Sequence, residues 1–258
     1  MRKFTLYLKK LIFKRLVVTE PVSMLDLKIK SKHQLNELLS KRKGNEFILT
    51  TFVNPFSYNV LLEKPELVSK MDVILSDGSL HKTLHNLFNP NKVDRASFDF
   101  SSLAADVFAN AEENNLKVVL IGAKPGLVDI AKSNFKEMYP GLNIVFTHHG
   151  YFNDEAEQEA IINLADRCDP DIVIVGMGTP NQEYFLVRYS QIANNYCQLY
   201  TCGGFIEQSA IKADYYHPLI KKLGLRWLQR AVMHSHVRQR LIKDYPRFVI
   251  RYIAAHLR

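Results

Sequence analysis

Cysteine is scarce in this chain, and its cysteines lack the spacing of a metal site. Three occur, at Cys168, Cys197 and Cys202. They form no CxxC pair, so the sequence predicts neither a disulfide framework nor a thiolate zinc site. A reducing cytoplasm fits this cysteine usage best.

Long apolar runs are also lacking. Residues 1–18 mix lysine and arginine with aliphatic and aromatic residues, but contain no uninterrupted apolar stretch of signal-peptide or membrane-span length. We interpret this start as a basic amphipathic segment. No internal repeat or low-complexity stretch is evident.

Acidic residues are outnumbered by basic ones. The chain has 34 Lys and Arg against 26 Asp and Glu, a formal net charge of +8. This excess suggests an anionic partner, which leaves nucleic acid, a phospholipid surface and a phosphorylated substrate open. With 258 residues and 47% hydrophobic content, the chain is long and apolar enough for one large core or two modest ones, so disorder is excluded.

Apolar runs alternate with stretches of helical periodicity through most of the chain. We predict strands at 46–53, 71–75, 117–121, 143–147, 171–175 and 199–201, and helices at 57–70, 127–138, 154–167 and 185–194. This alternation predicts an α/β fold with a mostly parallel sheet covered by helices on both faces. We divide the chain into residues 1–45 (basic amphipathic segment and start of the domain), 46–220 (sheet domain) and 221–258 (basic, amphipathic helical appendage).

Five short motifs carry a resemblance to a known family. They are LIGAKPG at 120–126, HGYF at 149–152, GMGTPNQE at 176–183, CGGF at 202–205 and LGLRWLQR at 223–230. Their order resembles that of the WecG/TagA/CpsF glycosyltransferases (glycosyltransferase family 26), from about residue 50 to about residue 240.

This resemblance implies a Rossmann-like catalytic domain that needs no metal and no cofactor. It implies an inverting glycosyltransferase that moves a sugar of the ManNAc, ManNAcA or glucose type from a UDP-sugar donor to a polyprenyl-pyrophosphate-linked acceptor, in bacterial cell-surface polysaccharide biosynthesis. It further implies a peripheral position on an anionic membrane, the inner face of the cytoplasmic membrane. Homo-oligomers are common in such a family, and no nucleic-acid partner is expected.

Asp77 is the candidate catalytic residue, because the family has an Asp-Gly pair at a strand end whose aspartate is proposed as the base. Asp77-Gly78 matches that pair, and Asn54 matches an asparagine that lines the same pocket. A turn after Asp77 would leave its carboxylate facing a cleft, where it deprotonates an acceptor hydroxyl. The alternative is that Asp-Gly is simply a turn pair. The family's Arg-x-x-Gly-x-Asp segment is shortened here to residues 95–99.

Glycine turns follow the later strands, where ligands of parallel sheets bind. Gly122 and Lys124 suggest a turn with amides and a lysine near an anion, with a solvated lysine as the alternative. Gly178 lies in a near-match to a dinucleotide fingerprint that Pro180 and Asn181 interrupt, which disfavours a nicotinamide enzyme.

Several further side chains are candidates for the donor site. We predict binding roles for Tyr151, Gln182, Glu183, Gly203 and Gly204. For Tyr151 the alternative is core packing, for Glu183 a favourable helix-start charge, and for the glycines a plain loop. His148 and His149 are adjacent and lack acidic partners at ligand spacing, so no metal site is predicted.

The tail carries arginines at helical spacing. We predict that Arg226, Arg230, Arg238 and Arg240 bind a lipid pyrophosphate and anionic head groups. A solvated basic face is the alternative. Two other functions remain open: a nucleic-acid-binding module, motivated by the charge, and an inactive nucleotide-sugar-binding partner, motivated by the altered motifs.

Overall fold

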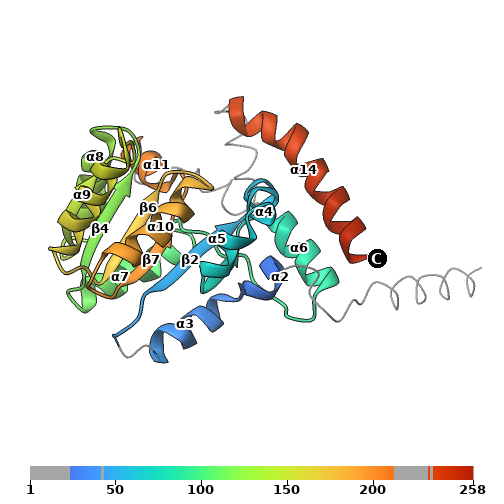
Figure 1. Ribbon diagram of the computed structural model, residues 1–258, viewed down its shortest axis with the longest axis horizontal. Coiled ribbons are helices and arrows are strands. Elements are labelled where there is room, and N and C mark those ends of the chain that lie inside the picture. The colour runs from blue at the N-terminus through green and yellow to red at the C-terminus, as the bar shows by residue number, and fades with distance from the viewer. Residues whose placement is uncertain (1–23, 42–43, 212–231, 233–234, 258) are drawn as a thin grey trace, which may run out of the picture.

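The computed structural model describes residues 24–41, 44–211, 232 and 235–257 (Figure 1). The N-terminal half contains α2 (Met24–Lys28), β1 (Ile29–Lys30), α3 (Lys32–Lys41), β2 (Ile48–Val53), α4 (Pro55–Leu62), α5 (Pro65–Lys70), β3 (Val73–Ser76), α6 (Ser79–Phe88) and α7 (Leu103–Glu113). The rest contains β4 (Lys117–Gly122), α8 (Leu127–Met138), β5 (Asn143–His148), α9 (Glu155–Asp166), β6 (Ile172–Gly176), α10 (Asn181–Ile192), β7 (Gln198–Thr201), α11 (Phe205–Ile211) and α14 (Ser235–His256).

The strands form one seven-stranded sheet in the order β1-β3-β2-β7-β6-β4-β5. Every strand pair in it is parallel, so the predicted mostly parallel sheet is confirmed and is wholly parallel in the described part of the chain. Each strand therefore ends at the same edge of the sheet. The loops that begin there converge on one region.

Two hydrophobic layers cover the sheet, one on each face. Along β4, Val119 and Ile121 point into the first layer, while Val118 and Leu120 point into the second. The first layer packs against α4, α5, α9, α10 and α14, and the second against α3, α7, α8 and α11. This burial on both sides explains why β4 and β6 are continuous apolar runs.

The predicted strands agree with the observed ones to within two residues, but the helices differ in several places. Helix α10 begins at Asn181 and not at 185, and α6, α7 and α11 were not predicted. The helix predicted at 57–70 is two helices, because Pro65 lacks an N–H group and starts α5 at its first turn. The short strand β1 was not predicted, since two residues give no periodicity. Within the 1–45 segment, Leu25, Ile29 and Leu35 are buried, so residues 24–41 belong to the sheet domain.

Helix α14 is the described part of the C-terminal appendage. It lies beside α4 and α6, at the far end of the molecule from α8 and α9 (Figure 1). Phe248, Tyr252 and His256 are buried against the domain and follow helical spacing. No helix in the described ranges is long and apolar enough to cross a membrane.

Candidate functional site

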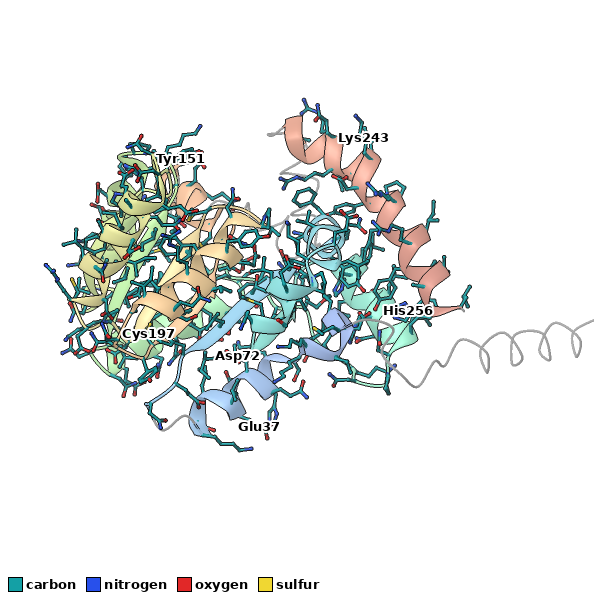
Figure 2. All side chains as sticks on the ribbon, in the orientation of Figure 1. Glu37, Asp72, Tyr151, Cys197, Lys243 and His256 are labelled. Atoms are coloured by element: carbon teal, nitrogen blue, oxygen red, sulfur yellow. The ribbon has the colours of Figure 1, made fainter. Side chains whose placement is uncertain are left out.

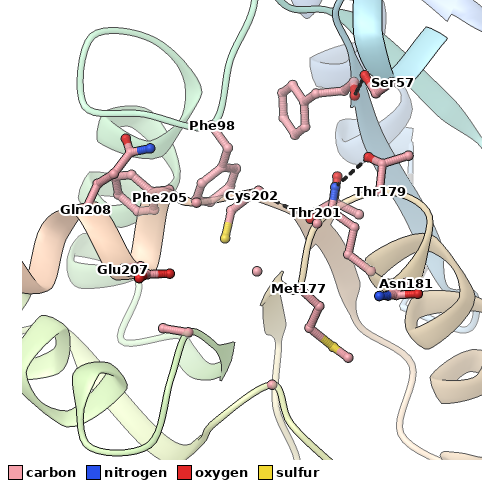
Figure 3. A pocket seen from close by; sticks show the side chains of 18 of the residues that line it. Ser57, Phe98, Met177, Thr179, Asn181, Thr201, Cys202, Phe205, Glu207 and Gln208 are labelled. Atoms are coloured by element: carbon pink, nitrogen blue, oxygen red, sulfur yellow. Dashed lines mark hydrogen bonds between the residues drawn. The ribbon is translucent and has the colours of Figure 1, made fainter. Parts of the chain in front are cut away.

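A pocket of about 920 Å³ opens at the carboxyl edge of the sheet. Residues from the loops after β2 to β7 line it, together with α11 and α14. Figure 3 shows Phe205, Glu207 and Gln208 of α11 across the pocket from Thr179 and Asn181 at the start of α10. The segments that follow β2 to β7 therefore meet at one cavity.

Asp77 lines this pocket directly after β3. Its backbone N–H donates to the carbonyl oxygen of Val53 at 2.8 Å, which ties the residue to the end of β2. Gly78 follows with φ +90°, a conformation that favours glycine, and α6 begins at the next residue. The Asp-Gly pair is thus a turn, and that turn leaves the Asp77 carboxylate in the pocket.

Arg95 lies beside Asp77 and was not among the predicted site residues. Its Nη2 atom lies 3.4 Å from Oδ1 of Asp77, 2.8 Å from Oγ of Ser97 and 3.4 Å from Oδ2 of Asp99. The N–H of Ala96 donates to the Ser76 carbonyl oxygen at 2.8 Å, which holds this loop against the end of β3. The sequence signal that could have pointed to Arg95 is its place at the start of the shortened segment 95–99, which matches the family's Arg-x-x-Gly-x-Asp segment.

Asp99 also lines the pocket and stays ionised. Burial alone would raise the pKa of its carboxyl group. Hydrogen bonds from Ser101 and Ser97 and the charge of Arg95 outweigh burial and lower the pKa below its usual value. The Arg95 guanidinium therefore lies between two carboxylates at one side of the pocket.

Asn54 lines the pocket and caps helix α4. Its Oδ1 atom accepts hydrogen bonds from the backbone N–H groups of Phe56 and Ser57, at 2.9 and 3.1 Å. The Ser57 hydroxyl in turn accepts from the Asn54 N–H, which completes a capping box. Since Oδ1 is used by the cap, a hydrogen bond from the Asn54 side chain to a ligand has to come from its Nδ2 group.

Gly122 shapes the pocket without lining it. A Cβ atom at this position would lie 2.4 Å from the carbonyl oxygen of Gly176, so the end of β4 can approach β6 this closely because residue 122 is glycine. A Cβ atom at Gly176 would instead lie 2.8 Å from the carbonyl oxygen of Gly203, in the loop after β7. Ala123 and Gly150 line the cavity instead. The predicted amide cradle is not formed at Ala123, whose N–H donates to Gly176.

Lys124 is solvent-exposed and does not line the pocket. Its Nζ atom lies 3.8 Å from Oε1 of Glu207, which is a lining residue. The structure thus places Lys124 at the rim, next to the first turn of α11.

Gln182 connects two pocket loops. Its Oε1 atom accepts from the N–H of Gly203 at 3.0 Å, and its Nε2 atom donates to Thr179 at 3.3 Å. Gly178 and Gly203 have φ values of +74° and +56°, so both loops turn through conformations that favour glycine. Gly178, Gln182, Gly203 and Gly204 all line the pocket, and their role in binding the donor stays a prediction.

Glu183 lies beneath the pocket and is fully buried. Its Oε1 atom accepts from Thr51 at 2.7 Å, from Thr179 at 3.1 Å and from Gln182 at 3.1 Å. Its Oε2 atom has no hydrogen-bond partner among the described residues. Burial raises the pKa of this carboxyl group. Glu183 lies in the first turn of α10, which begins at Asn181 and not at the predicted 185. Its burial leaves no solvated charge there, and it is not among the residues that line the cavity.

Tyr151 is exposed and lines the pocket, whereas the neighbouring Phe152 packs inward. The Phe152 ring stacks on Phe185 and on His148. Core packing, the alternative considered for Tyr151, is therefore seen for Phe152 and not for Tyr151. No group of three or more His, Cys, Asp or Glu residues that could hold a metal ion occurs in the described part of the chain.

Arg240 of α14 reaches the same pocket. Its guanidinium carbon lies 3.8 Å from the centre of the Phe56 ring, a cation–π contact with α4. Arg238 lies away from the pocket lining and donates to the Val232 carbonyl oxygen at 3.1 Å. Arg226 and Arg230 lie outside the described residues.

The charge of the described lining is predominantly negative. The carboxylates are those of Asp77, Asp99, Asp154, Glu155 and Glu207. Arg240 is the basic residue among the described lining residues. A negatively charged ligand in this cavity would find its favourable charge at the α14 side.

Comparisons with known proteins match nearly the whole chain. The family described as "Glycosyl transferase WecG/TagA/CpsF family" matches residues 20–258, beyond both ends of the expected 50–240. The UDP-Gal:alpha-D-GlcNAc-diphosphoundecaprenol beta-1,4-galactosyltransferase of Shigella boydii is 39% identical over 91% of this chain and 97% of that protein. The N-acetylglucosaminyldiphosphoundecaprenol N-acetyl-beta-D-mannosaminyltransferase of Staphylococcus aureus (strain MW2) is 27% identical over 65% of this chain and 64% of that protein.

Proposed function

Since this chain belongs to the WecG/TagA/CpsF glycosyltransferase family, we propose that it transfers a sugar from a UDP-sugar to a sugar carried on undecaprenyl diphosphate. The names of the Shigella and Staphylococcus relatives both specify a diphosphoundecaprenol-linked acceptor sugar. The observation that carries the proposal is the Asp77 carboxylate, held by β2 and Arg95 in a pocket that glycine turns and Arg240 also line.

The proposed donor is UDP-galactose. The sequence suggested ManNAc, ManNAcA or glucose, but the relative that spans nearly the full length at 39% identity is a galactosyltransferase. The mannosaminyltransferase from Staphylococcus matches a shorter region at 27% identity. The acceptor sugar proposed from the same comparison is α-linked GlcNAc.

Asp77 acts as the general base in the proposed reaction. Its carboxylate removes the proton from an acceptor hydroxyl as the oxygen attacks the anomeric carbon of the donor. The bond from that carbon to the diphosphate oxygen breaks, and UDP leaves from the opposite face. One displacement inverts the anomeric configuration. Arg95 keeps the carboxylate in place through its 3.4 Å contact.

The β4–β7 side of the pocket is proposed to bind the nucleotide. Tyr151 offers an exposed ring for stacking on uracil, and Gly178, Gly203 and Gly204 let a ligand approach the backbone. Gln182 holds the Gly178 and Gly203 loops together through Thr179 and Gly203. Arg240, on the α14 side of the pocket, is proposed to supply positive charge for the diphosphate of the lipid acceptor instead.

Helix α14 is proposed to face the inner surface of the cytoplasmic membrane. Its outward side carries Ile242 and Ile250, which are 74% and 69% exposed, next to Lys243 and Arg247. Figure 2 shows Lys243 on the half of α14 opposite His256. Exposed apolar and basic side chains on one helix suit an anionic lipid surface. The predicted roles of Arg226, Arg230 and Arg238 belong to the same proposal.

Disaccharide-lipid synthesis tests the proposed function. Full-length protein in anionic vesicles is incubated with UDP-galactose, UDP-glucose or UDP-ManNAc and with undecaprenyl-diphosphate GlcNAc, and the lipid products are identified by mass spectrometry. We expect one added hexose from UDP-galactose. UDP binding without product from any donor would instead support an inactive nucleotide-sugar-binding partner.

A further inference from the structure

A buried polar cluster joins α14 to the domain at the end of the helix far from the pocket. Asp26 of α2 is at its centre. Its Oδ2 atom accepts from the Tyr58 hydroxyl at 2.9 Å, and its Oδ1 atom accepts from the Tyr252 hydroxyl at 3.2 Å. Nδ1 of His85 and Nε2 of His256 lie 3.9 and 3.8 Å from this carboxylate. The cluster therefore unites α2, α4, α6 and α14.

The geometry of the Tyr252 hydroxyl is fixed from two sides. Asn89 Nδ2 donates to the Tyr252 hydroxyl oxygen at 2.9 Å, so the hydroxyl hydrogen is available for Asp26. His81 packs beside the Tyr252 ring. Burial lowers the pKa of His81 to about 3, so this neighbour is neutral. Nδ1 of His85 lies 3.5 Å from the same hydroxyl oxygen, as a third polar neighbour. The Tyr252 hydroxyl is thus held between α2 on one side and α6 with its C-terminal cap on the other.

Hydrogen bonds of this kind specify how α14 is rotated about its axis. The aromatic packing of Phe248 against Tyr58, with ring centroids 5.3 Å apart, attracts the helix but is weakly directional. Hydrogen bonds to a buried carboxylate are directional and costly to leave unmade. A shift of one residue along the helix rotates a side chain by about 100°. Such a shift would move Tyr252 away from Asp26.

The same rotation determines whether Arg240 reaches the pocket. Arg240 precedes Tyr252 by twelve positions on α14, a rise of about 18 Å, and the helix runs through Pro246 between them without ending. At that end its guanidinium contacts Phe56, which lies two positions before Tyr58 on α4. Figure 2 shows His256, close to the cluster, at the opposite end of α14 from Lys243. The helix α4 therefore contacts α14 both at the cluster and at the pocket.

We propose that Asp26, Tyr252 and His256 are positioning residues that hold α14 in the rotation that places Arg240 at the pocket. This inference rests on the proposed role of Arg240 in binding a substrate diphosphate. None of the cluster residues lines the pocket. The cluster acts through the orientation of α14. Loss of the cluster should therefore raise KM more than it lowers kcat.

The experiment compares Tyr252→Phe with Tyr189→Phe in the full-length protein. Tyr189 is a matched control, because it is also fully buried but its hydroxyl has no hydrogen-bond partner among the described residues. Amide hydrogen exchange is measured over residues 238–245. We expect exchange there to rise roughly fivefold in Tyr252→Phe, the equivalent of one lost net hydrogen bond, and to stay unchanged in Tyr189→Phe.

A double-mutant cycle with Arg240→Ala tests the functional part. We expect Tyr252→Phe to raise the KM for the lipid acceptor roughly fivefold with little change in kcat, and to have no further effect when Arg240 is already alanine. Asp26→Asn serves as a second variant should Tyr252→Phe fold poorly. Unchanged exchange in both cluster variants, or an effect on KM that persists in Arg240→Ala, would overturn the positioning role. An Arg240→Ala protein with normal kinetics would instead overturn the proposed role of Arg240 itself. The exchange data would in that case still show whether the cluster holds α14 in place.

Discussion

The loops after β4 and β6 and the loops after β2 and β3 shape the same pocket by different means. On the first side, Gly122 lets β4 approach Gly176, and Gly176 lets β6 approach Gly203, each so closely that a Cβ atom would not fit. On the second side, Asp77, Arg95 and Asp99 form a chain of charged contacts. One side therefore fixes the shape of the cavity through its backbone, while the other carries the charged side chains that we propose take part in proton transfer.

The largest effect on the charged side is expected from Asp77→Asn. Removal of the base should lower kcat by about a thousandfold, because general base catalysis contributes on the order of 10²–10⁴-fold. Steady-state rates with UDP-galactose and the lipid acceptor measure this effect, and UDP affinity by calorimetry should be unchanged.

Asp154→Asn is the matched control for that variant. Asp154 also lines the pocket, but its Oδ1 atom accepts from the Glu157 N–H at 2.8 Å and caps α9, a role that asparagine can fill. We expect its kcat to change less than threefold, by about half a kcal/mol in barrier height. Equal losses in Asp77→Asn and Asp154→Asn would contradict a specific base at Asp77.

Gly122→Ala should disrupt the close approach of β4 and β6 beside the pocket. The added Cβ atom would lie 2.4 Å from the Gly176 carbonyl oxygen, and the φ of +151° is strained for alanine. We expect the free energy of unfolding to fall by about 3 kcal/mol, measured by urea denaturation. Gly141→Ala is the control, because its Cβ atom would meet only the flexible Glu112 side chain, at 3.1 Å.

Arg240→Ala should have a smaller effect, confined to substrate binding. Loss of a charged hydrogen-bond donor to a diphosphate should raise KM by roughly 10- to 100-fold and leave the unfolding free energy nearly unchanged. The control is Arg251→Ala on the same helix, where the guanidinium contacts Glu63 at 3.0 Å away from the pocket. If both variants raise KM equally, the charge of α14 as a whole matters and the position of Arg240 does not.

Glu183→Gln should have the smallest effect. We expect it only in how the free energy of unfolding depends on pH. The folded-state pKa of Glu183 is raised above the unfolded value of 4.5, so its contribution to stability is complete below pH 4.5 and is lost as pH rises through the raised pKa. Glutamine keeps the Oε1 acceptor for Thr51 and does not titrate.

The stability of Glu183→Gln relative to the parent protein should therefore increase with pH in that window, by at most about 1.4 kcal/mol per pH unit. Urea denaturation at several pH values measures the difference. A difference independent of pH would mean that Glu183 is ionised in the folded protein.

The sheet and the position of Asp77 in the site could be predicted from local sequence. Apolar runs such as 117–121 and 171–175 defined the buried strands, and the Asp-Gly pair placed Asp77 at a strand end. Arg95 was missed because its contact with Asp77 joins a loop to a strand eighteen positions earlier. The burial of Glu183 depends on Thr51 from a distant strand, a contact that no local pattern encodes.

The placement of Arg240 was predictable only in part. Helical spacing identified a basic amphipathic tail, but the face that meets the pocket depends on how α14 packs on α4. That packing involves Asp26, more than two hundred positions away from Tyr252, so it lies beyond any periodicity argument.

The most direct test of the account is the anomeric configuration of the product. Parent protein and Asp77→Asn are incubated with UDP-α-galactose and undecaprenyl-diphosphate GlcNAc, and the new linkage is assigned by the proton coupling constant of its anomeric centre. The account predicts a β-linked galactose from the parent protein and almost none from Asp77→Asn. An α-linked product, or full activity of Asp77→Asn, would contradict a single inverting displacement with Asp77 as its base.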